Sequence, residues 1–139
     1  MSKHSYGMFM ARSAALTGTC NRRQIGAALF KGDICFAVGN NGPLNLKCEC
    51  PGRDTPAGSG SAICYGMHAE QRALTAPRAP GFTDFDTIYC TKAPCKACVL
   101  LLLGTSCEEI VFETPSNEVE NMELWIAAGR TWTHYGSQE

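Results

Sequence analysis

The sequence of 139 residues has no excess charge of either sign, few aromatic residues and no long apolar run. Twelve lysines and arginines face 13 acidic residues, which gives a formal net charge of −1, and aromatic residues make up 9% of the chain. A protein that holds a nucleic-acid strand normally has a basic groove with aromatic platforms for stacked bases. The composition therefore argues against that class, whereas a small anionic ligand needs only a few local cations.

Features of membrane and secreted proteins are missing as well. The longest apolar run covers residues 99–103, whereas a transmembrane helix needs about 20 apolar residues. Residues 1–10 contain no apolar segment and no secretory cleavage pattern. We therefore expect a cytoplasmic protein that does not contact membranes.

Cysteine is the exception to these shortages, with nine residues. An odd number of cysteines in a chain without secretory features argues against a disulfide framework. Metal ligands and small buried side chains are the expected uses of cysteine in such a protein. Cys35, Cys90 and Cys107 lie in or beside apolar segments, so we expect them in the core.

Apolar segments alternate with turn residues in a way that predicts one α/β domain over residues 1–139. A hairpin turn at 31–33 joins the first two strands, whereas the later strands alternate with helices, as in a parallel sheet. We therefore expect a mixed five-stranded sheet with helices on both faces. Residues 44–61, rich in Gly, Pro and Cys, form a long insertion that bound metal could hold. Helices are predicted over 6–16, 64–76, 95–103 and 119–128, and strands over 25–30, 34–38, 87–91, 109–112 and 131–134.

Two short motifs place an imidazole, a carboxylate and two thiols at the starts of predicted helices. His68-Ala69-Glu70 opens one helix, and Pro94-Cys95-Lys96-Ala97-Cys98 opens the next, one strand later. Cysteines three residues apart lie on nearly the same helix face, and the first turn of a helix favours thiolate over thiol. His68, Cys95 and Cys98 therefore fit a catalytic zinc that keeps an open fourth position.

Glu70 adds the proton carrier that hydrolysis at such a site requires. Two residues after His68, its carboxylate can reach a water at the open position without being a ligand itself. H-x-E followed by P-C-x-x-C is the signature of zinc-dependent nucleobase deaminases, in which zinc makes hydroxide available for attack on C4 of cytosine. A CxxC alone also occurs in redox dithiols and structural zinc sites, so the ordered pair of motifs carries the prediction.

Four segments make the chain resemble the deoxycytidylate (dCMP) deaminases of the cytidine deaminase superfamily. They are CNRRQIGA at 20–27, GNNGP at 39–43, CYGMHAEQ at 64–71 and IYCTKAPCKAC at 88–98. The resemblance implies a three-layer α/β/α sandwich, a homohexamer, and hydrolytic deamination of dCMP to dUMP, which feeds thymidylate synthesis. It also implies activation by dCTP and inhibition by dTTP, each bound with Mg²⁺. It does not choose firmly between dCMP and dCTP as substrate.

The resemblance also assigns roles to individual residues. Zinc ligation carries over to His68, Cys95 and Cys98, and the proton shuttle to Glu70. The backbone N–H of Ala69 carries over as a contact to the pyrimidine carbonyl, and Asn41 as a contact to the sugar. Arg78 follows the HAE helix and is a candidate contact for the 5′-phosphate.

The 39–43 loop lies near the effector site in the family, which makes nearby residues candidate effector contacts. The family usually has an aromatic residue where this chain has Asn40, and its proline comes one residue later than Pro43. Effector choice therefore stays open, and two solvated surface arginines are an equal alternative for the Arg22–Arg23 pair. The candidate effector contacts are Arg22, Arg23, Asn40 and Gly42.

Four further cysteines are candidate ligands of a second, structural zinc. In family members with a similar loop, such a zinc often holds the loop, and it would explain how this polar insertion stays ordered. Ordinary buried thiols are the alternative. The four residues are Cys20, Cys48, Cys50 and Cys64.

Two other classes of protein share the zinc motifs. A deaminase of tRNA or single-stranded nucleic acid has the same ligands, but the net charge of −1 and the few aromatic residues argue against it. A non-catalytic, zinc-stapled interaction module has no need of a carboxylate such as Glu70 beside an open metal position. The sequence therefore favours a deaminase of small nucleotides that has no nucleic-acid partner.

Overall fold

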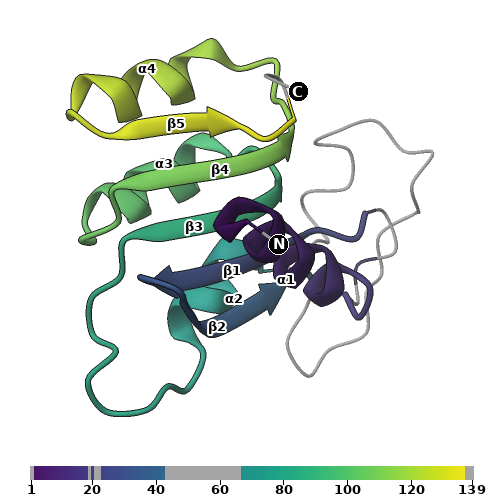
Figure 1. Ribbon diagram of the computed structural model, residues 1–139. Coiled ribbons are helices and arrows are strands. Elements are labelled where there is room, and N and C mark those ends of the chain that lie inside the picture. Colours follow the sequence, from purple (N-terminus) through teal and green to yellow (C-terminus); the bar gives the residue numbers. More distant parts are fainter. Residues whose placement is uncertain (1, 19, 21–22, 43–66, 137–139) are drawn as a thin grey trace.

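The computed structural model describes residues 2–18, 20, 23–42 and 67–136 (Figure 1). Across the sheet that these residues form, the strands lie in the order β2-β1-β3-β4-β5. The elements, in chain order, are α1 (Lys3–Ala15), β1 (Gly26–Lys31), β2 (Ile34–Asn40), α2 (Ala69–Thr75), β3 (Thr87–Lys92), α3 (Lys96–Leu103), β4 (Glu109–Thr114), α4 (Val119–Ala127) and β5 (Thr131–His134).

Strand directions confirm the predicted mixed five-stranded sheet. β1 runs antiparallel to both β2 and β3, and β3, β4 and β5 are parallel to one another. The tight turn between β1 and β2 contains Gly32 with a φ of +60°, a conformation that glycine adopts without steric cost. The parallel strands β3, β4 and β5 are instead joined by helices, because a parallel connection must carry the chain back to the end of the sheet where the previous strand began.

Alternate residues of the strands build two cores, one on each face of the sheet. Ala27 and Leu29 of β1 pack with residues of α2, α3 and α4, whereas Ala28 and Phe30 pack with Met8 of α1. Figure 1 shows α1 on one face of the sheet, with α2 and α3 on the opposite face. The predicted three-layer α/β/α sandwich is therefore confirmed.

Two predicted helix starts were wrong. α1 begins at Lys3 and not at residue 6, because Ser2 caps it by accepting a hydrogen bond from the Ser5 N–H. α2 begins at Ala69 and not at residue 64, because Met67 forms a backbone bridge with Gly42 through bonds of 2.9 and 3.0 Å. That bridge holds the chain extended directly before His68, so His68 caps the helix from outside it.

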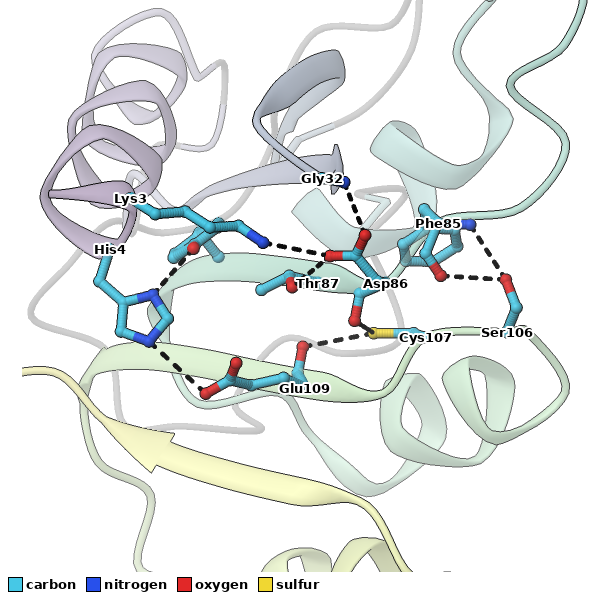
Figure 2. Close-up of polar contacts among 10 residues, drawn as sticks. Lys3, His4, Gly32, Phe85, Asp86, Thr87, Ser106, Cys107 and Glu109 are labelled. Carbon is cyan, nitrogen blue, oxygen red and sulfur yellow. Dashed lines mark hydrogen bonds and ion pairs between the residues drawn. The ribbon is translucent and has the colours of Figure 1, made fainter.

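Polar contacts fix the first turn of α1 to the amino ends of β3 and β4 (Figure 2). Lys3 Nζ lies 3.4 Å from an Asp86 carboxylate oxygen. His4 Nδ1 lies 2.9 Å from the Tyr89 hydroxyl, and His4 Nε2 lies 3.6 Å from a Glu109 carboxylate oxygen. The predicted metal ligands Cys95 and Cys98 follow the opposite, carboxyl end of β3.

The core cysteines lie where the sequence predicts them. Cys90 and Cys107 are fully buried, and Cys35 is partly buried beside the α1 core. Burial raises the pKa of Cys107 to about 12, so its thiol stays protonated and unreactive. Within the described ranges, none of the helices has the length and apolarity that a bilayer crossing requires.

Candidate metal centre

The structure brings His68, Cys95 and Cys98 together, with their ligand atoms within 4.8 Å of one another. His68 Nδ1 lies 3.4 Å from Cys95 Sγ and 3.5 Å from Cys98 Sγ. With Zn–S bonds of about 2.3 Å and Zn–N bonds of about 2.0–2.1 Å, tetrahedral zinc separates nitrogen and sulfur ligands by about 3.5–3.6 Å. The donor atoms thus already have the spacing of a zinc site, and one imidazole with two thiols is a donor set that zinc prefers.

Two helix N-termini supply these ligands. His68 is the N-cap residue of α2, where its own N–H donates to Gln71 Oε1 at 2.9 Å in a capping box. Cys95 is the N-cap residue of α3, and Cys98 lies one turn later on the same helix. Backbone N–H groups and the positive ends of the helix dipoles therefore point at the ligand cluster and stabilise negatively charged sulfur.

The protonation of the two thiols is uneven. The pKa of Cys95 is lowered to about 3, first because Cys98 donates a hydrogen bond to its sulfur and second because His68 does so. The pKa of Cys98 is raised, since it donates that bond and is also desolvated. The lowered pKa of Cys95 favours its thiolate, the form in which cysteine binds a metal.

Glu70 lies in the first turn of α2 with its side chain only 4% exposed. Burial raises the pKa of its carboxyl group. A raised pKa suits a group that must both accept and donate a proton near neutral pH. In the part of the chain described here, the cluster of mutually close donor atoms contains His68, Cys95 and Cys98 and not Glu70, as the proton-shuttle prediction requires.

Two features hold α2 against the sheet. Gly39 of β2 faces the helix so closely that an added Cβ would lie 2.4 Å from the Ala69 carbonyl oxygen and from the Ala73 nitrogen. Arg72 Nη1 also donates to Asn40 Oδ1 at 2.6 Å and to the Asn40 carbonyl at 3.2 Å. The helix that carries His68 and Glu70 is therefore fixed to the end of β2.

The two predicted contacts to pyrimidine and sugar differ in their surroundings. Ala69 is the first residue of α2, so its N–H has no acceptor inside the helix and can donate to a ligand carbonyl. Asn41 instead spans the end of the β1–β2 pair, where Oδ1 accepts from the Ile25 N–H at 2.7 Å and Nδ2 donates to the Arg23 carbonyl at 3.0 Å. Its sugar contact stays a prediction.

Arg78 is not brought to the metal ligands. Its guanidinium donates to the carbonyl of Leu74 at the C-terminal end of α2 and to that of Phe82, and it lies 5.2 Å above the Phe36 ring. The last carbonyls of a helix need such donors, and this end of α2 is the one farther from His68. The predicted phosphate contact of Arg78 stays a prediction.

The predicted effector residues are divided between two places. Arg23 lines an open groove of about 530 Å³ beside the C-terminal end of α1, together with Arg12, Gln24 and Lys92. Asn40 and Gly42 do not line that groove, because Asn40 bonds to Arg72 and Gly42 pairs with Met67. Arg22 lies outside the described residues, as do Cys48, Cys50 and Cys64 of the predicted second zinc site, whereas Cys20 is described and partly buried.

Sequence reasoning missed Arg72 and Asn121. Asn121 is a fully buried amide in α4 whose Nδ2 donates to the Pro94 carbonyl, directly before Cys95. Its position four residues before Trp125 was an available signal, because residues four apart share a helix face and a large aromatic residue marks the buried one. No comparable signal pointed from Arg72 to Asn40, which lies 32 residues earlier.

Comparison with known proteins agrees with this site. Residues 1–114 match the family described as the cytidine and deoxycytidylate deaminase zinc-binding region. The deoxycytidylate deaminase of Schizosaccharomyces pombe is 29% identical over 133 residues, which cover 90% of this chain and 41% of that protein. The deoxycytidylate deaminase of Mycobacterium phage D29 is 29% identical over 122 residues, which cover 80% of this chain and 94% of that protein. The chain thus spans less than half the length of the fission-yeast relative.

Solved structures share the fold at low sequence identity. The dCMP deaminase from cyanophage S-TIM5, in complex with dCMP and dUMP, has a TM-score of 0.74 at 22% identity and covers 95% of each chain. Acinetobacter baumannii RibD has a TM-score of 0.66 at 20% identity, over 95% of this chain and 35% of that one. By its match over residues 1–114, the chain belongs to the family that carries the cytidine and deoxycytidylate deaminase zinc-binding region.

Proposed function

We propose that the protein catalyses the hydrolysis of dCMP to dUMP and ammonia. The observation that carries this proposal is a buried carboxyl, Glu70, packed against a zinc-spaced set of one imidazole and two thiols. Relatives named as deoxycytidylate deaminases support dCMP as the substrate, and so does a similar fold solved in complex with dCMP and dUMP.

The residues divide the chemistry among them. His68 would hold the zinc ion through Nδ1, and Cys95 and Cys98 would hold it through their sulfurs. Bound zinc supplies a Lewis acid that makes hydroxide available near neutral pH for attack on C4 of the cytosine ring. Glu70 would accept the proton that the water loses, deliver it to ring N3 and then help to protonate the leaving amine.

Backbone and loop groups would orient the nucleotide. The Ala69 N–H would donate to the pyrimidine carbonyl, since it heads α2 next to His68. Asn41 Nδ2 carries two hydrogens, of which one is donated to the Arg23 carbonyl. The other would meet a hydroxyl or the ring oxygen of the sugar.

Regulation by dCTP and dTTP with Mg²⁺ is a finer part of the proposal. The groove beside α1 has a volume of about 530 Å³ and is lined by Arg12, Arg23 and Lys92, and such a volume lies in the range of small-molecule sites. Glu113 also lines the groove and forms an ion pair with Arg12. The three cations still outnumber this one carboxylate, and cationic side chains suit a polyphosphate. Steady-state rates with dCMP, measured with and without each effector and Mg²⁺, test this part.

A homohexamer is the proposed assembly. α3 and α4 expose apolar side chains that water disfavours, namely Leu100, Leu101, Val119 and Ile126, which are 47–58% exposed. Burial against another copy of the chain would cover them. Light scattering on the zinc-loaded protein measures the assembled mass directly.

A substrate panel tests the central proposal. The zinc-loaded protein is incubated with dCMP, dCTP, cytidine or a single-stranded oligonucleotide, and loss of cytosine absorbance is followed. We expect rapid turnover of dCMP. Turnover of the oligonucleotide alone would favour a nucleic-acid deaminase instead, and no turnover at full zinc occupancy would favour a zinc-stapled interaction module.

A further inference from the structure

Asn121, in the first turn of α4, contacts the segment that leads into the metal ligands. Its side chain is 0% exposed, and its Nδ2 donates to the Pro94 carbonyl at 3.3 Å. Among the residues that the structure describes, no donor reaches its other polar atom, Oδ1. A buried acceptor without a donor destabilises a fold, so a leucine of similar size would serve packing alone better. What the amide adds is the hydrogen bond to Pro94.

That hydrogen bond fixes the peptide through which the chain enters Cys95. The Pro94 carbonyl and the Cys95 N–H belong to one planar unit, so holding the oxygen also holds the rotation of the peptide. Cys95 has extended backbone angles, φ −73° and ψ 170°, and its side chain makes no capping bond to the helix. The direction of its Cα–Cβ bond, which aims Sγ at His68, therefore depends on this peptide.

Neighbouring residues have anchors of their own, but these lie on either side of Pro94. The Ala93 N–H donates to the Thr114 carbonyl at 2.8 Å, and the Cys95 carbonyl accepts from the Val99 N–H at 2.9 Å. Pro94 has no N–H to donate, so its carbonyl is the only hydrogen-bonding group that it offers. Asn121 thus secures the point between the end of β3 and the start of α3.

We propose that Asn121 is a positioning residue of the metal centre, which holds the Pro94 peptide and thereby sets the orientation of Cys95 Sγ. The inference rests on the proposed binding of zinc by His68, Cys95 and Cys98. Groups that orient a metal ligand typically account for about 10–100-fold in metal affinity, and we expect an effect of this size here.

Two substitutions and one matched control test the proposal. Asn121→Leu keeps the volume and removes the donor, and Asn121→Asp keeps the shape and replaces the donor by an acceptor. The control, Glu120→Gln, alters the preceding residue and removes only its surface ion pair with Lys96, in which both side chains are more than half exposed. Surface pairs of this kind contribute little to stability.

The measurement is the zinc affinity of each protein, by competition with a chromophoric chelator. A Cys95→Ser preparation reports any zinc bound elsewhere in the chain. We expect both Asn121 variants to lose about 10–100-fold in affinity, while Glu120→Gln stays at the wild-type value. Cobalt-substituted protein gives a second readout, because its visible absorption reports the placement of the sulfur ligands and does not respond to stability as such.

Three results would overturn the proposal. The first is a folded Asn121→Leu protein with wild-type zinc affinity and a wild-type cobalt spectrum. The second is a loss of zinc affinity in Glu120→Gln that equals the loss in the Asn121 variants. The third is failure of the Asn121 variants to fold even at saturating zinc, which would show that Asn121 has a purely structural role. Failure of the metal site itself is separately visible, since wild-type protein would then bind no more zinc than Cys95→Ser.

Discussion

Replacing Gly39 by alanine should displace the helix that carries His68 and Glu70. A Cβ on residue 39 would lie 2.4 Å from the Ala69 carbonyl oxygen and 2.4 Å from the Ala73 nitrogen, whereas ordinary contact begins at 3.4 Å. Both obstructing atoms belong to the backbone of α2 and cannot rotate away. The helix as a whole must therefore move from β2 by about 1 Å, and a misplacement of that size can cost about 100-fold in rate.

Gly26→Ala is the matched control, because Gly26 lies on the neighbouring strand and faces the opposite helix. Its Cβ would lie 1.9 Å from the Ala11 carbonyl oxygen of α1. Overpacking of this kind costs about 1–3 kcal/mol of stability and applies to both variants. We expect Gly39→Ala to lose about 100-fold in kcat/KM for dCMP, since α2 carries His68 and Glu70. Gly26→Ala should lose much less, because the α1 that it displaces reaches α2 through the side-chain bonds of Asn40.

The assay compares rates per bound zinc with thermal unfolding of the same samples. Normalisation to zinc is needed because a shift of α2 also moves His68. The reasoning fails if Gly39→Ala keeps the wild-type kcat/KM at matched zinc occupancy, or if Gly26→Ala loses as much activity as Gly39→Ala.

Two further predictions concern Glu70 and Asp86. Glu70→Gln should keep its zinc and lose about 10²–10⁴-fold in turnover, as measured by metal content and dCMP rates; undiminished turnover would remove Glu70 from the mechanism. Although partial burial opposes it, bonds from the Gly32 N–H, Thr87 and Lys3 hold the pKa of Asp86 below its ordinary value. A lowered carboxyl pKa stabilises the fold above the unfolded pKa of about 3.9, and that stabilisation is lost as pH falls through the folded pKa. At pH 6 the wild-type protein should therefore have a higher melting temperature than Asp86→Asn. The difference between the two melting temperatures should shrink between pH 5 and pH 2, and a constant difference would contradict this account.

The sheet and the ligand cluster could be predicted from sequence because their signals are local. Short continuous apolar runs mark β1, β3 and β4. The spacing from Cys95 to Cys98 places both sulfurs at one helix start whatever surrounds them. The start of α2 could not be predicted in this way. It depends on the bridge between Met67 and Gly42, two residues that are far apart in the chain.

The environments of single side chains were also beyond the sequence. From the sequence, Arg78 is a cationic residue that follows the HAE helix, and those two properties were the whole basis for predicting a phosphate contact. In the structure its guanidinium contacts the carbonyls at the end of α2 and the Phe36 ring, and no sequence pattern indicated these contacts. Asn121 acts on Pro94, 27 residues away in the chain, so nothing in the motif around Cys95 points to it.

Asn40 is a predicted effector residue whose contacts join the two faces of the sheet. Its Oδ1 accepts from Arg72 of α2 at 2.6 Å, and its Nδ2 donates to Thr17 Oγ1 at 2.9 Å and to the Ala14 carbonyl at 3.2 Å. Ala14 lies next to Ala15, which lines the groove beside α1. Under the regulatory proposal, a ligand that shifts the end of α1 would therefore act on the helix of Glu70 through this side chain.

The ratio of the dCMP rate with dCTP to the rate without it measures this coupling and does not depend on the basal rate. Asn40→Leu removes the side-chain bonds to both helices, so we expect its activation ratio to fall toward one, since coupling needs differential contacts in the two states. Thr17→Val removes the 2.9 Å bond from Asn40 and the 3.1 Å bond from Thr17 Oγ1 to the Ala14 carbonyl. It keeps the Asn40 bonds to Ala14 and Arg72, so it should reduce the ratio less. A folded Asn40→Leu enzyme with the wild-type ratio would show that the groove acts on α2 by another route. A wild-type enzyme that ignores both dCTP and dTTP would instead overturn the regulatory proposal and leave the role of Glu70 untouched.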